Sequence, residues 1–382
     1  MRILMVHNGY QQRGGEDSVV EAEIQLLRES GNKVTEYSRH NDEIKQLGKL
    51  AIAHDTVWSN KTVAEVAELV TLHRLDIIHV HNTFPLISPS IYWAASRENI
   101  PIVQTLHNFR FLCPQAMFLR DGAVCEDCLG KVPWRGVVRK CYRDSILQSA
   151  VLASSITFHK AVGTYRNKVT RYIALNEFSR KKFIAGGIPE NKISVKPNFI
   201  DCAAMPHWDT REGGLFVGRL SKEKGLDVLA AAVKVLIKNP VKVVGGGELQ
   251  DFAVQSFGDK YLGFQSLENI LGLMSRSTYL VISSVCYEQF PRTIAEAFAC
   301  GLPVIASRLG ALAEIVDDGR TGLLFESGNA QDLAKKIAWA EAHPNEMMVM
   351  GRAARKEYED KYTSQRNYDL LMNIYEDAIE HN

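Results

Sequence analysis

The feature that most constrains this fold is a regular alternation of short apolar runs with longer stretches of helical periodicity. Strands are predicted at residues 3–6, 34–37, 77–81, 102–106, 172–175, 193–196, 215–217, 241–244, 279–282 and 303–305. Helical patterns lie between several of these runs, for example at residues 18–30 and 226–237. A chain of this kind folds into parallel sheets with helices on both faces. The predicted fold class is therefore α/β.

Two irregular segments interrupt this rhythm and indicate how the chain is divided. Cysteines, glycines and basic residues replace periodicity at 108–143, and a polar stretch at 201–214 is typical of a linker. With 382 residues, the chain is also too long for one ordinary core. We predict a Rossmann-like domain at 1–200 with a Cys-rich insertion at 108–143, a second Rossmann-like domain at 201–363, and a C-terminal helix at 364–382 that packs back toward the first domain.

The composition argues against two classes of protein. The formal net charge is +1, so the whole chain has no general attraction to nucleic acid. No apolar stretch reaches the ~18–20 residues that a membrane span requires. The first strand is predicted from residue 3, which leaves no room for a secretory signal. We therefore expect a cytoplasmic protein.

Two turn segments of the second domain carry residues suited to a phosphorylated ligand. The segment 218–225 joins a strand to a helix and contains Arg219 and Lys224, two cations that can flank a diphosphate. The segment 288–296 leads into a helix whose first N–H groups favour an anion, and it contains Glu288 and Glu296. The alternatives are a solvated basic turn and two surface glutamates.

Glycines occupy two further turns of the same kind. Gly245 and Gly247 follow the strand at 241–244, and Gly14 and Gly15 follow the first strand. Glycine allows a backbone to approach a ligand closely. Each turn is weak evidence alone, but all four join a strand to a helix, where parallel sheets bind their ligands.

Together these segments resemble the retaining glycosyltransferases of family 4. The resemblance covers nearly the whole chain and is most specific in the Glu-x7-Glu motif from Glu288 to Glu296. It also includes the turn at 218–225, the glycines at 14–15 and the segment 310–322. The family has the GT-B fold, in which two Rossmann-like domains with parallel sheets face a central cleft. The resemblance therefore implies this architecture, with residues 1–200 as the acceptor-side domain and residues 201–363 as the donor domain.

The resemblance also implies roles for individual residues. Arg219 and Lys224 are expected to hold the donor diphosphate, Glu288 and His107 to face the donor sugar, and Glu296 to bind the ribose hydroxyls. His107 without the resemblance would be an ordinary residue at the end of a strand. The other expected donor-binding residues are Gly14, Gly15, Gly245, Gly247, Phe264, Gln289, Phe290, Pro291 and Arg292. Many relatives have smaller residues where Gln289 and Pro291 stand, so donor choice does not carry over.

The activity implied by the resemblance is sugar transfer with retention of anomeric configuration. The donor is expected to be a nucleotide sugar, with UDP preferred to GDP. The acceptor is expected to be a glycan or a lipid-linked intermediate of envelope, capsule or exopolysaccharide synthesis. No cofactor is implied for catalysis. The alternatives are a catalytically silent GT-B scaffold that binds sugar or nucleic acid, and a sugar-nucleotide epimerase, which needs no acceptor.

Four of the seven cysteines form a Cys-x11-Cys-x2-Cys-x12-Cys array in the irregular segment. Its members are Cys113, Cys125, Cys128 and Cys141. This spacing is typical of a structural zinc site closed by four thiolates. An iron–sulfur cluster and uncoordinated thiols are the alternatives.

Basic residues dominate the segment 131–171, in which Asp144 is the only acid. A zinc knuckle beside these bases would suit nucleic acid, and a solvated face is a second alternative, but we expect no nucleic-acid partner. We predict instead that the segment docks on an anionic membrane surface, on the inner face of the cell membrane. The candidates for shallow insertion are Trp134, Ile146, Leu147, Val151 and Leu152.

Overall fold

The computed structural model describes residues 1–12, 14–201, 206–208 and 211–382. The linker predicted at 201–214 therefore lies partly outside the described residues. The chain divides into two compact units. The first comprises Met1–Phe118, Glu126–Pro197 and Asn367–Asn382, and the second comprises Leu119–Cys125 and Asn198–Arg366.

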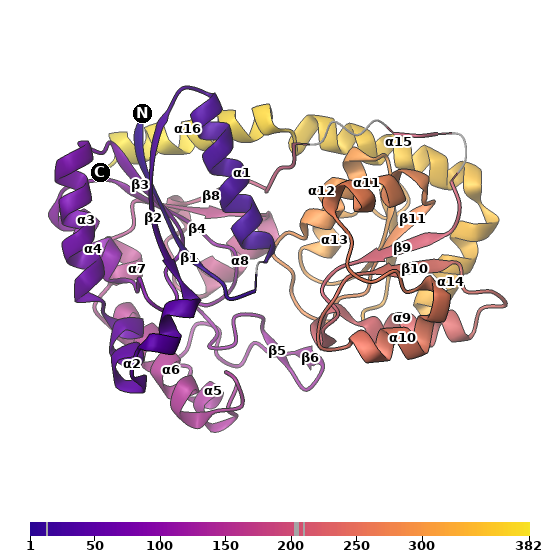
Figure 1. The fold of residues 1–382 in the computed structure, drawn as a ribbon, viewed down its shortest axis with the longest axis horizontal. Coiled ribbons are helices and arrows are strands. Elements are labelled where there is room, and N and C mark those ends of the chain that lie inside the picture. Colours follow the sequence, from indigo (N-terminus) through magenta and orange to yellow (C-terminus); the bar gives the residue numbers. More distant parts are fainter. Residues whose placement is uncertain (13, 202–205, 209–210) are drawn as a thin grey trace. The chain divides into compact units, whose positions relative to one another are not determined.

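A six-stranded parallel sheet forms the centre of the first unit (Figure 1). Its strands, in spatial order, are β2 (Lys33–His40), β1 (Arg2–Gly9), β3 (Ile77–Asn82), β4 (Ile102–Thr105), β7 (Arg171–Ala174) and β8 (Ile193–Val195). From β1 the chain passes to β2 on one side of β1, and then to β3 on its other side. The direction in which strands are added therefore reverses between β1 and β3. Open α/β sheets bind ligands beyond the carboxyl ends of the strands at such a reversal.

Helices cover this sheet, and several begin at a side chain that caps them. Ser59, Ser145 and Asn176 each accept a hydrogen bond from a backbone N–H of the following first turn. The helices are α1 (Gly15–Glu29), α2 (Lys49–Val57), α3 (Asn60–His73), α4 (Ser90–Arg97), α5 (Trp134–Val138), α6 (Ile146–Ala161), α7 (Thr164–Asn167) and α8 (Glu177–Ala185), with 3-10 turns η1 (Asn41–Gln46) and η2 (Glu190–Lys192).

Helix α16 (Ser364–Glu380) completes the core of the first unit, although most of the second unit precedes it in the sequence. Its buried residues Leu371 and Tyr375 pack with Ile24 of α1 and with Ile3 and Ile77 of the sheet. Asp377 of the same helix pairs with Arg171 of β7. The sheet face between α1 and α16 is therefore closed by residues from both ends of the sequence.

The second unit contains a five-stranded parallel sheet of the same kind. Its order is β10 (Val241–Val244), β9 (Gly214–Val217), β11 (Tyr279–Ile282), β12 (Val304–Ser307) and β13 (Gly322–Phe325). The reversal here lies between β9 and β11. The helices are α9 (Leu226–Lys234), α10 (Gln250–Phe257), α11 (Leu267–Arg276), α12 (Arg292–Ala299), α13 (Leu312–Ile315), α14 (Ala330–Ala342) and α15 (Pro344–Lys361), with 3-10 turns η3 (Lys222–Lys224) and η4 (Gly258–Lys260).

These two parallel sheets confirm the α/β fold class. The segment predicted to be irregular contains a short antiparallel hairpin, β5 (Leu119–Arg120) with β6 (Ala123–Val124), and the short helix α5. None of the helices within the described ranges combines the length and apolar character that a bilayer crossing needs.

Candidate active site

Two loops meet at the topological reversal of the second unit. The first follows β9 and runs through Gly218 to η3, and the second follows β11 and runs to the start of α12. The hydroxyl of Ser283 donates to the carbonyl of Lys224 at 3.0 Å, and the N–H of Val285 donates to the carbonyl of Glu223 at 3.0 Å. These bonds fix the two loops to each other at the carboxyl edge of the sheet.

Lys224 and Glu288 form an ion pair across these two loops. The Lys224 ammonium lies 2.6 Å from Glu288 Oε1, which also accepts a 2.6 Å hydrogen bond from the Ser284 hydroxyl. Burial alone would lower the pKa of Lys224, but the charge and hydrogen bond of Glu288 outweigh it, and the pKa is raised. Lys224 therefore stays charged, and the structure brings this predicted cation and this predicted acid together.

Arg219 is held differently, at the outer edge of the same loop. Its guanidinium donates to Glu223 Oε1 at 2.6 Å, and Ser221 donates to the same oxygen at 2.7 Å. Burial alone would raise the pKa of Glu223, but the hydrogen bond from Ser221 and the Arg219 charge lower it. The Arg219 side chain is 62% exposed, so its charge faces solvent from a fixed position.

Helix α12 begins directly after the second loop, with Pro291 as the preceding residue. Glu296 lies in this helix with its side chain 10% exposed, and Arg292 one turn earlier approaches its carboxylate at 3.9 Å. Burial raises the pKa of Glu296, and the Arg292 charge offsets this only in part. The buried Arg292 Nε has no hydrogen-bond partner among the described residues. An unsatisfied donor therefore lies at the start of α12, where an anion is favoured.

Gly245 and Gly247 are required by the packing of one loop on another. A Cβ on Gly245 would lie 1.9 Å from the carbonyl oxygen of Gly218, and one on Gly247 would lie 2.5 Å from that of Leu220. Both glycines have φ values, +143° and +151°, that other residues rarely adopt. These glycines hold the Arg219 loop in place, which is a sufficient reason for their presence.

The aromatic residues predicted near the donor lie in contrasting environments. The Phe264 side chain follows Gly263 and is 85% exposed. The Phe290 side chain is buried and lies edge-on to Tyr362 at 5.3 Å. Phe290 therefore anchors its loop in the core, and only its backbone remains for a ligand, as it does for the neighbouring Gln289, which is also buried.

In the first unit, Gly14 and Gly15 lie at the start of α1, beside the reversal between β1 and β3. Within the described part of the chain, a Cβ on Gly15 would meet nothing within 4 Å, and one on Gly14 would meet only Asp17, at 3.7 Å. Packing does not explain these glycines, in contrast to Gly245 and Gly247. Asp17 accepts hydrogen bonds from the Gly14 N–H at 2.7 Å and shares a 2.8 Å contact with His7. The helix start is therefore fixed, with open space above the glycines.

Glu16 directly follows these glycines in the sequence, and its surroundings disfavour its charge. Its carboxylate accepts a 2.9 Å hydrogen bond from Tyr10, and its other oxygen is buried without a partner among the residues that the structure describes. Burial raises the pKa of Glu16 to about 7. This carboxyl group is therefore partly protonated at neutral pH.

His107 follows β4 and contacts a second histidine that the sequence analysis did not single out. His107 Nε2 lies 2.8 Å from Nδ1 of His81, and the two rings stack with centroids 5.1 Å apart. Burial lowers the pKa of His107 well below its ordinary value, and His81 lowers it further. His107 is therefore neutral at physiological pH.

The sequence analysis also missed the partners behind His107. Glu23 of α1, His79 and His81 of β3, and Lys196 after β8 form a buried polar cluster. The available signal was two histidines, separated by one residue, in an otherwise apolar strand. That spacing places both on one face of a strand, where a core face ordinarily carries apolar side chains.

The cysteines of the array lie in a segment rich in turns. Cys113 and Cys128 are buried, whereas Cys125 and Cys141 are partly exposed. The N–H of Leu129 donates to the carbonyl of Glu126, and that of Lys131 donates to the carbonyl of Cys128. Successive tight turns therefore surround the Cys-x2-Cys pair.

Apolar side chains are exposed along the basic segment, with one exception to the prediction. Leu147 is 79% exposed and Trp134 57%, and Ile146 is exposed beside them. Leu152, by contrast, is buried at 3% exposure within the first unit, so its predicted role in insertion is wrong. The reason is the helical period of α6, which turns Leu152 away from the face that carries Leu147.

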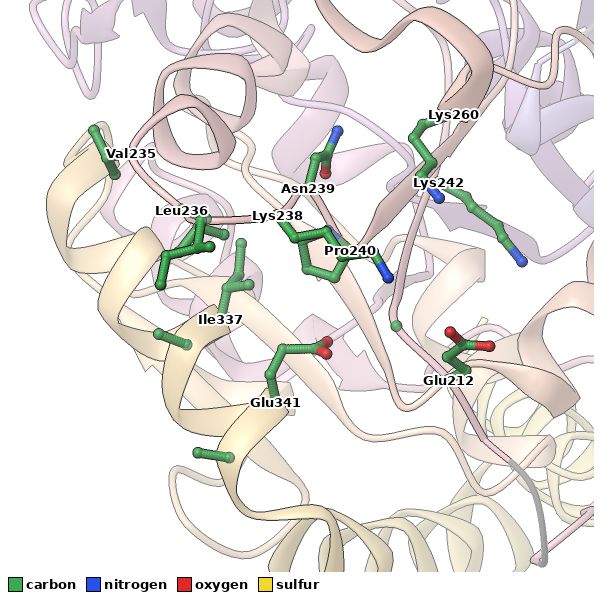
Figure 2. A pocket seen from close by; sticks show the side chains of 14 residues that line it. Glu212, Val235, Leu236, Lys238, Asn239, Pro240, Lys242, Lys260, Ile337 and Glu341 are labelled. Atoms are coloured by element: carbon green, nitrogen blue, oxygen red, sulfur yellow. The ribbon is translucent and has the colours of Figure 1, made fainter.

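The second unit also has a hollow of about 790 Å³ that none of these residues line (Figure 2). Gly213 and Pro240, which directly precede β9 and β10, form part of its wall together with Ile337 of α14. The hollow therefore lies at the amino edge of the sheet, opposite to the loops that carry Lys224 and Glu288. Ligands of parallel α/β sheets bind at the carboxyl edge, so this hollow is not the candidate site.

Family models and known proteins match this chain over most of its length. The family model described as Glycosyltransferase Family 4 matches residues 13–204, and the model described as Glycosyl transferases group 1 matches residues 209–357. An uncharacterized glycosyltransferase of Methanocaldococcus jannaschii is 34% identical over 44% of this chain and 48% of its own length. The N-acetyl-alpha-D-glucosaminyl L-malate synthase of Bacillus anthracis is 25% identical over 83% of this chain and 78% of its own.

Among solved structures, Anabaena HepE in complex with UDP is similar, with a TM-score of 0.66 and 18% identity. This match covers 98% of the present chain and 100% of HepE. The chain spans about half the length of several of the curated relatives that it matches. The structural likeness shows the GT-B fold, and the matched family models show that this chain belongs to glycosyltransferase family 4.

Proposed function

We propose that this chain is a retaining glycosyltransferase that transfers a sugar from a nucleotide sugar, with UDP preferred to GDP, to a hydroxyl acceptor. The acceptor class is a glycan or a lipid-linked intermediate of polysaccharide synthesis. Family membership supports the transferase reaction, and solved structures of the similar HepE hold UDP and UDP-glucose. These ligands belong to HepE and support the donor class here by similarity of fold.

The observation that carries the proposal is the Lys224–Glu288 pair beside the start of α12. Lys224 is charged and bound to the loop before α12, Arg219 is exposed in the same turn as Lys224, and α12 begins with an unsatisfied Arg292 donor. Such an arrangement suits the diphosphate of a donor, whose negative charge grows as the sugar leaves. In this reading, Glu288 contacts the sugar and Glu296 the ribose. Fixed charges that stabilise a departing diphosphate need no cofactor.

The test is a thermal-shift screen of the full chain against UDP-sugars, GDP-sugars and the free nucleotides. A ligand at 100 times its dissociation constant stabilises the folded state by about 2.7 kcal/mol. We expect one nucleotide series to raise the melting temperature and Glu296→Gln to abolish the shift. Lys222→Ala, which changes an exposed lysine of the turn that carries Lys224, is the control variant. No shift with any nucleotide would count against the proposal.

The reaction itself is read from the products. Incubation with the donor and a panel of acceptors, followed by NMR of the new glycosidic bond, reports its anomeric configuration. We expect the configuration of the donor to be retained. An inverted product would refute retention, and interconversion of the donor without any acceptor would favour the epimerase.

We also propose that the first unit docks on an anionic membrane surface through residues 131–171. The exposed Leu147, Trp134 and Ile146 lie within the basic segment, a combination that favours adsorption at a lipid interface. Docking there would bring the enzyme to a lipid-linked acceptor. Binding to vesicles that does not depend on their anionic lipid or on salt would contradict this proposal.

A structural zinc ion at Cys113, Cys125, Cys128 and Cys141 is a third proposal. The donor set is four thiols, the softest protein ligands, and the tight turns around Cys128 suit a Cys-x2-Cys knuckle. The ion would stabilise the irregular segment and would take no part in the reaction. We expect one zinc ion per chain by elemental analysis, and Cys128→Ser to lose it. A metal-free wild-type protein prepared with zinc in the medium would refute this site.

A further inference from the structure

The buried polar cluster behind His107 joins three parts of the first unit. Glu23 comes from α1, His79 and His81 from β3, and Lys196 follows β8. Each of these side chains is almost inaccessible, with exposures between 0 and 3%. Buried polar groups are costly unless they are paired, so the pairing determines the protonation state of each group.

The charges of the cluster balance without a metal ion. Lys196 Nζ donates to Glu23 Oε2 at 2.8 Å and to Asn367 Oδ1 at 3.1 Å. Ligand atoms of Glu23, His79 and His81 lie within 4.8 Å of one another, a spacing that a metal ion could use. The Lys196 ammonium already supplies the counter-charge, and a divalent cation beside it in a dry interior would be repelled. Glu23 and Lys196 therefore neutralise each other without a metal ion.

The contacts then determine which ring nitrogen carries the proton. Glu23 Oε1 lies 3.3 Å from His81 Nε2 and has His79 Nδ1 at 3.2 Å on its other side. Neither atom is aligned for a hydrogen bond with a described residue, but a carboxylate oxygen this close to a ring nitrogen repels a bare lone pair and favours a proton there, which assigns the proton of His81 to Nε2. Its Nδ1 is then an acceptor. His107 Nε2, 2.8 Å from that Nδ1, must donate.

The remaining charged and titratable neighbours support a neutral His107. His79 is bound by Thr105 through Nε2 at 2.8 Å and by Tyr375 through Nδ1 at 2.7 Å. His7 of β1, on the other side, is engaged with Asp17. Burial, followed by repulsion from His79, lowers the pKa of His81 to about 3. His81 and His107, which face each other, are therefore both neutral near pH 7.

We propose that Glu23 and His81 are positioning residues that hold His107 as its Nε2–H tautomer, so that its Nδ1 accepts a hydrogen bond from a substrate hydroxyl. The last step rests on the proposed function. A neutral ring with a bare Nδ1 repels a phosphate oxygen and attracts an O–H group. His107 thus selects a hydroxyl group of the sugar or acceptor over a phosphate oxygen.

The first test reads the tautomer of His107 in the ligand-free full chain. Long-range 1H–15N correlation spectra of protein labelled in histidine distinguish a protonated ring nitrogen from a bare one, and His107→Gln assigns the signal. We expect Nε2 protonated and Nδ1 bare. A proton on Nδ1 of His107 overturns the proposal whatever the enzyme does, and this result does not depend on any sugar donor.

The second test compares two variants of His81. His81→Phe removes the acceptor, so we expect a mixture of His107 tautomers and a loss of turnover between ~10- and ~100-fold, with donor affinity largely unchanged. His81→Asn keeps a carbonyl acceptor close to the position of His81 Nδ1 and should restore both the tautomer and most of the turnover. An unchanged tautomer in a folded His81→Phe refutes the role of His81. A mixed tautomer with full turnover refutes the hydroxyl contact.

Discussion

Replacement of Lys224 by methionine tests the candidate active site most directly. The side chain keeps its length and loses its charge, which leaves the Glu288 carboxylate, 13% exposed, without its 2.6 Å partner. Removing one member of a largely buried pair costs about 3 kcal/mol of stability. For a unit of this size, that corresponds to a melting temperature lower by roughly 6–12 °C. The lost stabilisation of the diphosphate lowers turnover by a further ~10²–10³-fold.

Three further variants separate the stability effect from the catalytic one. Arg219→Met removes a charge that is 62% exposed, so it should cost at most ~1 kcal/mol of stability but a similar factor in turnover. Lys222→Met is the matched control and should change neither quantity. In Lys224→Met combined with Glu288→Gln, no buried charge is left, so the loss of stability should be smaller than the sum of the single losses.

Thermal melts and the release of nucleoside diphosphate from the donor found in the screen give the two readouts. Wild-type melting temperature and turnover in Lys224→Met would refute the site. Strictly additive stability losses in the double variant would show that Lys224 and Glu288 do not form the pair in solution.

Three other regions of the chain give independent predictions. Gly245→Ala places a Cβ against the Gly218 carbonyl and should destabilise the chain by more than ~2 kcal/mol in denaturant melts, whereas Gly246→Ala, which meets nothing within 4 Å, should be neutral. The pKa of Glu16 is raised from 4.5 to about 7, so the folded state binds this proton more tightly than the unfolded state. The wild type should therefore lose on the order of 3 kcal/mol of folding stability as the pH rises from 4.5 to 7. Glu16→Gln should remove that loss, and identical pH profiles of the two proteins would contradict this prediction. Leu147→Asp should weaken sedimentation with anionic vesicles several-fold, whereas Leu72→Asp, at an exposed site in α3, should not; equal effects would argue against docking through residues 131–171.

Buried parallel strands were the part of the fold that the sequence predicted best. The strands at 241–244 and 279–282 have the predicted bounds. The second is a continuous apolar run, as expected of a strand covered on both faces, and Lys242 is the one polar residue of the first. Helix α1 begins at Gly15, three residues before its predicted start, because Asp17 binds the Gly14 N–H and fixes the first turn. Strand β13 was not predicted, because its first residue, Gly322, was interpreted as the end of the motif at 310–322.

The candidate site was predictable where loops carry it and not where the core does. Lys224 and Glu288 lie in turns, and turn residues with charge are visible in a sequence. Glu23 and Lys196 lie 173 positions apart on buried elements, and each alone resembles an occasional polar residue in an amphipathic pattern. Only the tertiary structure shows that the two neutralise each other behind His107.

The packing of α16 has a consequence for how the protein is made. Its side chains Leu371, Ile374, Tyr375 and Ala378 fill the core formed by β1, β3 and α1. A ribosome synthesises those strands first, yet this core stays open until residue 378 has emerged. The second unit, whose sheet needs nothing beyond residue 366, can fold earlier. The half of the protein that is translated first is therefore the half that finishes folding last. Until α16 has been made, the apolar face of its sheet is uncovered.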